Sequence, residues 1–227
     1  MDRSRLKSAL LPPARTIRRL PFGIGRGLNM GVDFHRGETR LYLGLYEREL
    51  NRYLRRVVRQ GYACFDIGGQ YGYDALVLAK LSGGPVLSVE CDPQLAEEIQ
   101  ENAAANPGVG PISVVTAFVS AEDDGDRVSI DSLARRFFVP DLLKIDIEGE
   151  EVQALRGASD VLTRRRPAVV LEVHGEEVER ECLDLMRAAK YALPTTVDRR
   201  RWLPEHRPID HNRWLVFCAG AGASGMR

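Results

Sequence analysis

Short apolar runs along the chain alternate with longer segments in which apolar positions recur every three or four residues. A run of about four to eight apolar residues is typical of a buried strand, and the longer period is typical of a helix. We expect strands at residues 63–67, 86–89, 112–117, 142–147, 168–173, 192–197 and 214–218. We expect helices at residues 73–81, 93–105, 131–137, 150–163 and 176–190, with Asp131 as the N-cap of the third.

Strands that alternate with helices in this way predict an α/β fold, in which a mostly parallel seven-stranded sheet carries helices on both faces. No helix separates the last two strands. We therefore expect them to form an antiparallel hairpin at one edge of the sheet.

The first 60 residues follow a different pattern. Residues 1–38 contain Gly, Pro and Arg with little period, which predicts a loosely structured entry segment, and residues 41–58 repeat at helical spacing up to Gly61. Residues 1–60 hold fourteen Lys or Arg and five Asp or Glu, although the whole chain has no net charge. We therefore divide the chain into a basic extension (1–60), one domain (61–219) and a tail (220–227). The extension could contact phosphates, anionic lipid or the acidic face of the domain, or it could simply be solvated.

Composition indicates the cellular compartment of the protein. The four cysteines lie far apart, so neither a disulfide framework nor a cysteine metal site is expected, which favours the cytoplasm. No apolar run approaches the roughly 18 residues of a membrane span, and Pro12 and Pro13 interrupt the only apolar stretch near the start. We therefore expect neither a transmembrane segment nor a signal peptide.

Charged side chains stand at the carboxyl ends of the predicted strands. Charged residues are unfavourable inside a buried strand. Because ligands bind beyond the carboxyl ends in an open parallel sheet, charges at these ends indicate a binding site. The residues are Asp66, Glu90, Asp146, Glu148, Glu172 and His174.

A glycine-rich turn, FDIGGQYGYDA, follows the first of these strands and limits the class of ligand that can bind. Its glycines, Gly68, Gly69 and Gly72, do not have the GxGxxG spacing of a dinucleotide site, and Asp66 would repel a pyrophosphate. An acid at that position suits a cation, and Glu90 stands where an acid takes ribose hydroxyls. A cation and a ribose without a pyrophosphate describe S-adenosylmethionine. The alternative is that the glycines only permit a tight turn.

The sequence resembles the FkbM family of S-adenosylmethionine-dependent methyltransferases from about residue 62 to 217. FDIGGQYGYDALVLAKL and VLSVECDPQLAEEIQENAAAN are similar to its first two motifs, and the block PDLLKIDIEGEEVQALRGASDVLTRRRPAVVLEVH is the most diagnostic. Gly69, Gln70 and Cys91 depart from the usual family residues. The resemblance implies a Rossmann-like class I methyltransferase that methylates a hydroxyl on a sugar or secondary metabolite.

We expect the following residues to bind the cofactor: Asp66, Gly68, Gly69, Gln70, Gly72, Glu90, Phe118 and Asp146. Phe118 could lie against adenine or be an ordinary core residue, and Asp146 could lie beside the sulfonium or cap the next helix. His174 is the candidate general base, unless it is only an exposed strand-end histidine. Glu172 lies on the same strand face and could contact the acceptor. Asp146, Glu148 and Glu172 could hold a magnesium ion, but no tight metal-ligand spacing demands one, so we predict no metal.

Two further segments are candidates for the rim of the site. The loop at residues 199–212 holds Arg199, Arg200, Arg201, Trp202, His206 and His211, and forms either a substrate lip or a solvated loop. Tyr46 and Glu47, in the family-like stretch GLYERE, could close over the site.

Three other functions remain open. A nucleic-acid methyltransferase could use the basic extension for phosphates, although an NPPY-like motif is missing and nucleic acid is not the expected partner. A non-catalytic protein could keep only the cofactor pocket. A nicotinamide oxidoreductase would contradict the spacing of the turn.

Overall fold

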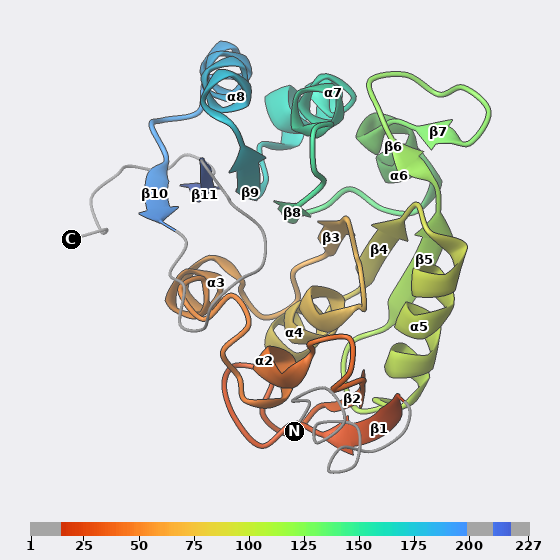
Figure 1. The fold of residues 1–227 in the computed structure, drawn as a ribbon. Helices are drawn as coiled ribbons and strands as arrows, with labels where there is room; N and C mark the ends of the chain where they lie inside the picture. The colour runs from red at the N-terminus through yellow and green to blue at the C-terminus, as the bar shows by residue number, and fades with distance from the viewer. Residues whose placement is uncertain (1–14, 199–210, 219–227) are drawn as a thin grey trace.

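The computed structural model describes residues 15–198 and 211–218, and its centre is a seven-stranded sheet (Figure 1). The strand order is β10-β11-β9-β8-β3-β4-β5. These strands are β3 (Cys64–Ile67), β4 (Val86–Glu90), β5 (Ile112–Thr116), β8 (Leu142–Ile145), β9 (Ala168–His174), β10 (Thr195–Asp198) and β11 (Asn212–Phe217). All seven strands predicted from the sequence are present.

The direction of the strands fixes where a ligand can bind. The five strands from β5 to β9 are parallel, whereas β11 runs antiparallel to both β9 and β10, as expected for an edge hairpin. From β3 the chain proceeds to β4 and β5 on one side and later to β8 and β9 on the other. The strand order therefore reverses between β3 and β8, and a crevice at their carboxyl ends is where such sheets bind ligands.

Helices cover both faces of the sheet, as Figure 1 shows. They are α4 (Tyr73–Ser82), α5 (Pro93–Ala104), α6 (Ile130–Arg136), α7 (Glu151–Arg156), the π-helical turn η1 (Val161–Arg165) and α8 (Glu176–Ala188). One buried cluster joins α4 to the face that carries Cys64 and Leu142, and the other joins α6, α7, η1 and α8 to the face that carries Phe65 and Leu143. The alternation of these neighbours between the two clusters is the period-two pattern of a strand buried on both sides.

Two predictions about the helices on the second face are wrong. Ser129 and not Asp131 is the N-cap of α6, since its side chain accepts from the backbone N–H of Ser132. The helix predicted at residues 150–163 is interrupted at Gly157, where a Cβ would lie 2.1 Å from the carbonyl oxygen of Ser120. Asp131 instead accepts from the backbone N–H of Val161 and so holds the start of η1.

The N-terminal segment is more ordered than the sequence predicts. Residues 15–38 contain an antiparallel hairpin of β1 (Thr16–Arg19) and β2 (Asn29–Val32), and residues 41–58 form two short helices, α2 (Thr39–Tyr42) and α3 (Asn51–Val57). A single helix is not possible because Gly44 has a left-handed φ of +67° and lies against Gly23, whose nitrogen a Cβ would meet at 2.6 Å. A further short pair, β6 (Phe118–Val119) and β7 (Arg127–Val128), follows β5.

The described part of the basic extension packs on the domain. Leu20, Met30 and Leu50 are completely or almost completely buried in the same cluster as α4. Arg15 pairs with Glu98 at 3.1 Å, and Arg36 pairs with the same carboxylate at 2.6 Å. The basic segment therefore contacts the acidic surface of α5, one of the options left open above. Within the described residues, none of the helices combines the length and the apolar character that a membrane span requires.

Candidate active site

The glycine turn after β3 lies directly against the end of β8. Gly68 has a φ of +84°, and a Cβ there would meet the carbonyl oxygen of Asp146 at 1.9 Å. At Gly69 a Cβ would meet the hydroxyl oxygen of Ser88 at 2.3 Å. Gly72, with a φ of +78°, is the N-cap of α4. The turn is this tight because backbone and small side chains fill the space that any larger residue would need.

Glu90 holds the turn from the neighbouring strand. Its carboxylate accepts from the backbone N–H of Gln70 at 2.8 Å and from that of Asp92 at 3.0 Å. Gln70 has a left-handed φ of +49°, which is costly for a residue with a side chain and is concentrated at functional sites. The sequence motif therefore brings together the predicted cofactor residues of β3 and β4.

A buried lysine lies at the centre of the strand ends. The Nζ atom of Lys144 is 2.8 Å from Asp74, 3.4 Å from Asp146 and 3.9 Å from Asp66. Asp66 is completely buried and accepts from the hydroxyl of Ser88 at 3.0 Å. Burial alone would lower the pKa of Lys144, but the surrounding carboxylates, Asp74 first, outweigh it and raise that pKa well above its usual value. Burial raises the pKa of Asp66, and Lys144 opposes this.

Glu47 brings a further carboxylate to this cluster from the N-terminal segment. It is buried, has a left-handed φ of +44°, and its Oε2 atom has no hydrogen-bond partner. Burial, followed by the charge of Asp74, raises its pKa well above the usual value. The neighbouring Tyr46 donates to the side-chain oxygen of Gln70 at 3.2 Å. Tyr46 therefore contacts the glycine turn, and Glu47 lies within electrostatic range of the charge cluster.

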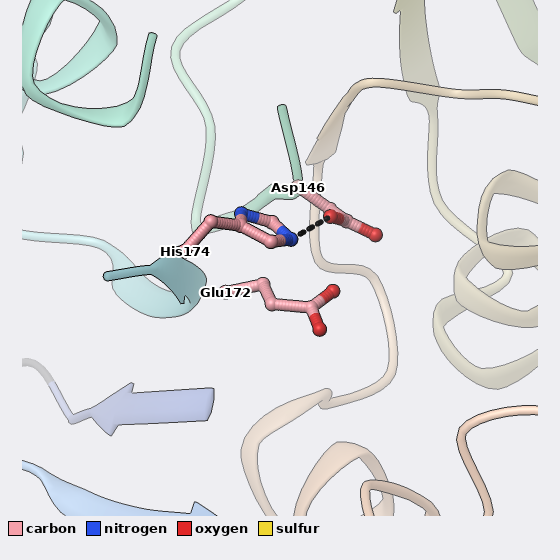
Figure 2. A group of neighbouring side chains, drawn as sticks. All are labelled: Asp146, Glu172 and His174. Carbon is pink, nitrogen blue, oxygen red and sulfur yellow. Dashed lines mark ion pairs between the residues drawn. The ribbon is translucent and has the colours of Figure 1, made fainter. Parts of the chain in front are cut away.

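Asp146, Glu172 and His174 converge at the ends of β8 and β9 (Figure 2). One potential ligand atom from each lies within 4.8 Å of the other two, and the Nε2 atom of His174 is 4.0 Å from a carboxylate oxygen of Asp146. The Nδ1 atom of His174 is 2.7 Å from Glu151, which is completely buried. Burial lowers the pKa of His174, but the hydrogen bond to Glu151 and the charge of Asp146 outweigh it and leave this pKa raised.

Two of the alternatives raised by the sequence are resolved here. Asp146 does not cap the helix that follows it, because the N-cap of α7 is Glu150, without a side-chain capping bond. Phe118 is 46% exposed and is therefore not a core residue, so its ring is accessible for stacking. Glu148, in the turn after β8, is exposed.

Of the predicted substrate loop, only residues 211 and 212 belong to the described part of the chain. Residues 199–210 lie outside the described residues. His211 lies 2.5 Å from Glu179 of α8, and the pair lines a shallow surface hollow together with Arg213. This hollow is formed by α8 and the start of β11, not by the strand ends that hold Asp146 and its neighbours.

Three residues of the site were missed by the sequence analysis. Lys144 and Asp74 form the closest ion pair of the buried cluster, and Glu151 fixes the imidazole of His174. A lysine inside an apolar strand was a visible signal, since a buried charge requires partners. Asp74 and Glu151 gave no signal, because a carboxylate in the first turn of a helix is common without a function.

The sheet order and the glycine turn give this chain the fold of the class I methyltransferases, a class whose methyl donor is S-adenosylmethionine. Residues 117–208 match the sequence model described as "Methyltransferase FkbM domain". The match confirms the resemblance seen in the KIDIEG block. No curated protein sequence matches the chain significantly.

Solved structures show the same fold at low identity. A methyltransferase FkbM from Methylobacillus flagellatus superposes with a TM-score of 0.57 at 18% identity, over 73% of this chain and 50% of that one. A precorrin-6y C5,15-methyltransferase from Geobacter metallireducens gives 0.54 at 13% identity, over 76% and 89% of the two chains. A ribosomal protein L11 methylase from Lactobacillus delbrueckii gives 0.52 at 15% identity, over 77% and 78%. Because their names indicate different acceptors, the fold alone does not define an acceptor.

Proposed function

We propose that this protein transfers the methyl group of S-adenosylmethionine to a hydroxyl of a small molecule or glycan. The observation that carries the proposal is the group of Asp146, Glu172 and His174 at the carboxyl ends of β8 and β9, beside the point where the strand order reverses. Its side chains come from the ends of two neighbouring strands and lie next to the glycine turn, where the fold class binds its donor.

The charges of the site fit the proposed cofactor. One lysine, Lys144, stands among several carboxylates, and an oxygen of Asp66 and one of Glu47 lack hydrogen-bond partners. A group of buried carboxyls with so few cations favours a sulfonium and an ammonium group and disfavours a pyrophosphate. Glu90 would accept from the ribose hydroxyls, the turn would approach the methionine end, and Phe118 would stack on adenine. Asp66 would act by its charge from beneath the turn.

In the proposed reaction the acceptor oxygen attacks the methyl carbon. The carbon–sulfur bond breaks as the carbon–oxygen bond forms, and the hydroxyl proton passes to the Nε2 atom of His174. The products are a methyl ether and S-adenosylhomocysteine. Glu151 would keep the Nε2 atom pointed at the acceptor because it binds Nδ1. Alignment can supply roughly 7–11 kcal/mol of such a barrier, whereas a general base contributes about 10²–10⁴-fold, so the base is the smaller term.

Other features support a small acceptor and a cytoplasmic location. Arg15 and Arg36 of the basic segment are paired with α5, which leaves fewer free cations for nucleic-acid phosphates. All four cysteines are free, and Cys64 and Cys182 are buried, as expected in a reducing compartment.

Calorimetry with S-adenosylhomocysteine, together with methyl transfer to a panel of sugars and hydroxylated metabolites, tests the proposal. We expect binding to the unmodified full chain and the formation of a methyl ether with at least one hydroxyl acceptor. Salt-dependent RNA binding with methylation of the RNA would refute the choice of acceptor. Binding without turnover on a broad panel, RNA and protein included, would favour a non-catalytic role.

A further inference from the structure

The group of Asp146, Glu172 and His174 has the composition of a metal site as well as of a catalytic group. We propose that these three side chains bind one divalent cation next to the cofactor. The role of the ion in catalysis rests on the proposed function. Binding of the ion does not, since it follows from the three side chains. The sequence predicted no metal because 25 residues lie between Asp146 and Glu172, and only the adjacent strand ends bring them together.

The spacing of the potential ligand atoms is the first support. They lie within 4.8 Å of one another, and the Nε2 atom of His174 is 4.0 Å from Asp146. This distance is too long for a direct hydrogen bond, which needs about 2.7–3.2 Å. Two ligands that are each about 2.1 Å from an ion can be up to about 4.2 Å apart, so an ion fits between the Nε2 atom of His174 and this oxygen of Asp146. Figure 2 shows the imidazole nitrogen turned toward the carboxylate of Asp146, with the carboxylate of Glu172 beside both.

The second support is the state of the imidazole. Glu151 is completely buried and accepts from the Nδ1 atom of His174 at 2.7 Å. The Nε2 atom is then the free ring nitrogen, and it faces the two carboxylates. A metal-bound histidine in proteins regularly donates its other ring nitrogen to a carboxylate in this manner, which fixes the ring and increases its basicity. The backbone N–H of His174 binds the same oxygen of Glu151 at 3.2 Å and holds the arrangement more firmly.

The third support is a shortage of cations for the carboxyl groups around the site. Glu47 is buried, its Oε2 atom has no hydrogen-bond partner, and its carboxyl is within electrostatic range of both Asp146 and Glu172. Lys144 is the buried cation nearby and already lies among three carboxylates. Buried charges require partners, and a divalent cation would supply the missing positive charge.

The ligand set indicates the kind of ion. One imidazole with two carboxylates is softer than the all-oxygen sites that magnesium and calcium prefer, and it contains no thiolate. A first-row divalent cation fits best, and Mn²⁺ is the probe of choice because its paramagnetism reports binding directly. An ion at this position would hold the acceptor oxygen and lower the pKa of its hydroxyl. His174 would then be a ligand instead of the base, and the hydroxyl proton, made more acidic by the ion, would pass to solvent water.

The test is Mn²⁺ binding to the full-length protein, followed by electron paramagnetic resonance and calorimetry, with Mg²⁺ and Zn²⁺ as competitors. We expect one ion per chain. His174→Ala should weaken its affinity at least tenfold, and Glu151→Gln should weaken it by about 10–100-fold, because the partner of a ligand histidine typically has this effect. His211→Ala is the matched control, since that histidine pairs with Glu179 away from the site, and it should leave the affinity unchanged.

Three outcomes decide the matter. Binding that His174→Ala abolishes and His211→Ala leaves intact supports the site, provided that circular dichroism shows both variants folded. If His174→Ala does not fold, Glu172→Gln takes its place in the same comparison. Absence of Mn²⁺ and Zn²⁺ binding at millimolar concentration overturns the inference, as does binding that neither site variant changes. S-adenosylhomocysteine binding is measured in parallel, so a failure of the metal site and a failure of the cofactor site are told apart.

Discussion

Replacement of Lys144 by methionine is the sharpest test of the buried charge cluster. Methionine keeps most of the volume of the side chain but removes the cation that lies 2.8 Å from Asp74 and 3.4 Å from Asp146. Loss of one partner of a buried ion pair typically costs about 3–5 kcal/mol, because the other charge stays buried without compensation. Since domains are stable by only about 5–15 kcal/mol, Lys144→Met should lose a large part of the total. In urea denaturation this corresponds to a midpoint lower by about 2 M.

Two comparisons decide whether the charge is the cause. Arg180→Met removes a cation from an exposed pair with Glu177, and should change stability by no more than about 0.5 kcal/mol. The double variant Lys144→Met/Asp74→Asn removes one stranded carboxylate, and should recover about 0.5–3 kcal/mol relative to Lys144→Met alone. A loss below about 1 kcal/mol in Lys144→Met, or a double variant no more stable than the single one, would refute the reasoning.

Three further predictions concern the residues expected to bind the cofactor, two of them tested by affinity and one by stability. Glu90→Gln should weaken S-adenosylhomocysteine binding by about 10–100-fold, as expected for the loss of a charged hydrogen-bond partner, and equal affinity by calorimetry would remove this residue from the ribose site. Gly68→Ala should destabilise the fold by at least about 3 kcal/mol because its Cβ would overlap backbone, whereas Gly149→Ala, with a similar φ but open space, should cost about 1 kcal/mol in thermal unfolding. Phe118→Ala should leave stability unchanged but reduce affinity by about 1–3 kcal/mol if the ring stacks on adenine. Phe137→Ala, another exposed ring, is its control and should bind normally.

The sheet and the cofactor turn could be predicted because their determinants are local in the sequence. Each buried strand is a run of apolar residues between turn signals, and 142–147 differs from the observed Leu142–Ile145 only at its end. The glycine turn and Glu90 are positioned by motif spacing. The strand ends that carry Asp146 and His174 could be placed at one edge because parallel strands share a direction.

The rest depends on contacts between distant segments. Glu151 meets His174 through the packing of α7 on β9, and Glu47 reaches the site only because α2 and α3 fold back over α4. Neither contact follows from a period or a propensity. The two short helices near the N-terminus were predicted as one because the close approach of Gly44 to Gly23 is a tertiary contact. Asp131 was assigned to the wrong helix because its carboxylate accepts from the backbone N–H of Val161, a residue much later in the sequence.

The position of β11 between β9 and β10 has a consequence for synthesis of the protein. β9 pairs along its whole length from Val169 to His174 with β11, a strand that the ribosome releases some forty residues later. Until then β9, with Glu172 and His174, is an open sheet edge, the kind of surface that joins other chains. The nascent protein should therefore be most prone to aggregate in that interval, and the acceptor side of the site should be the last part to mature.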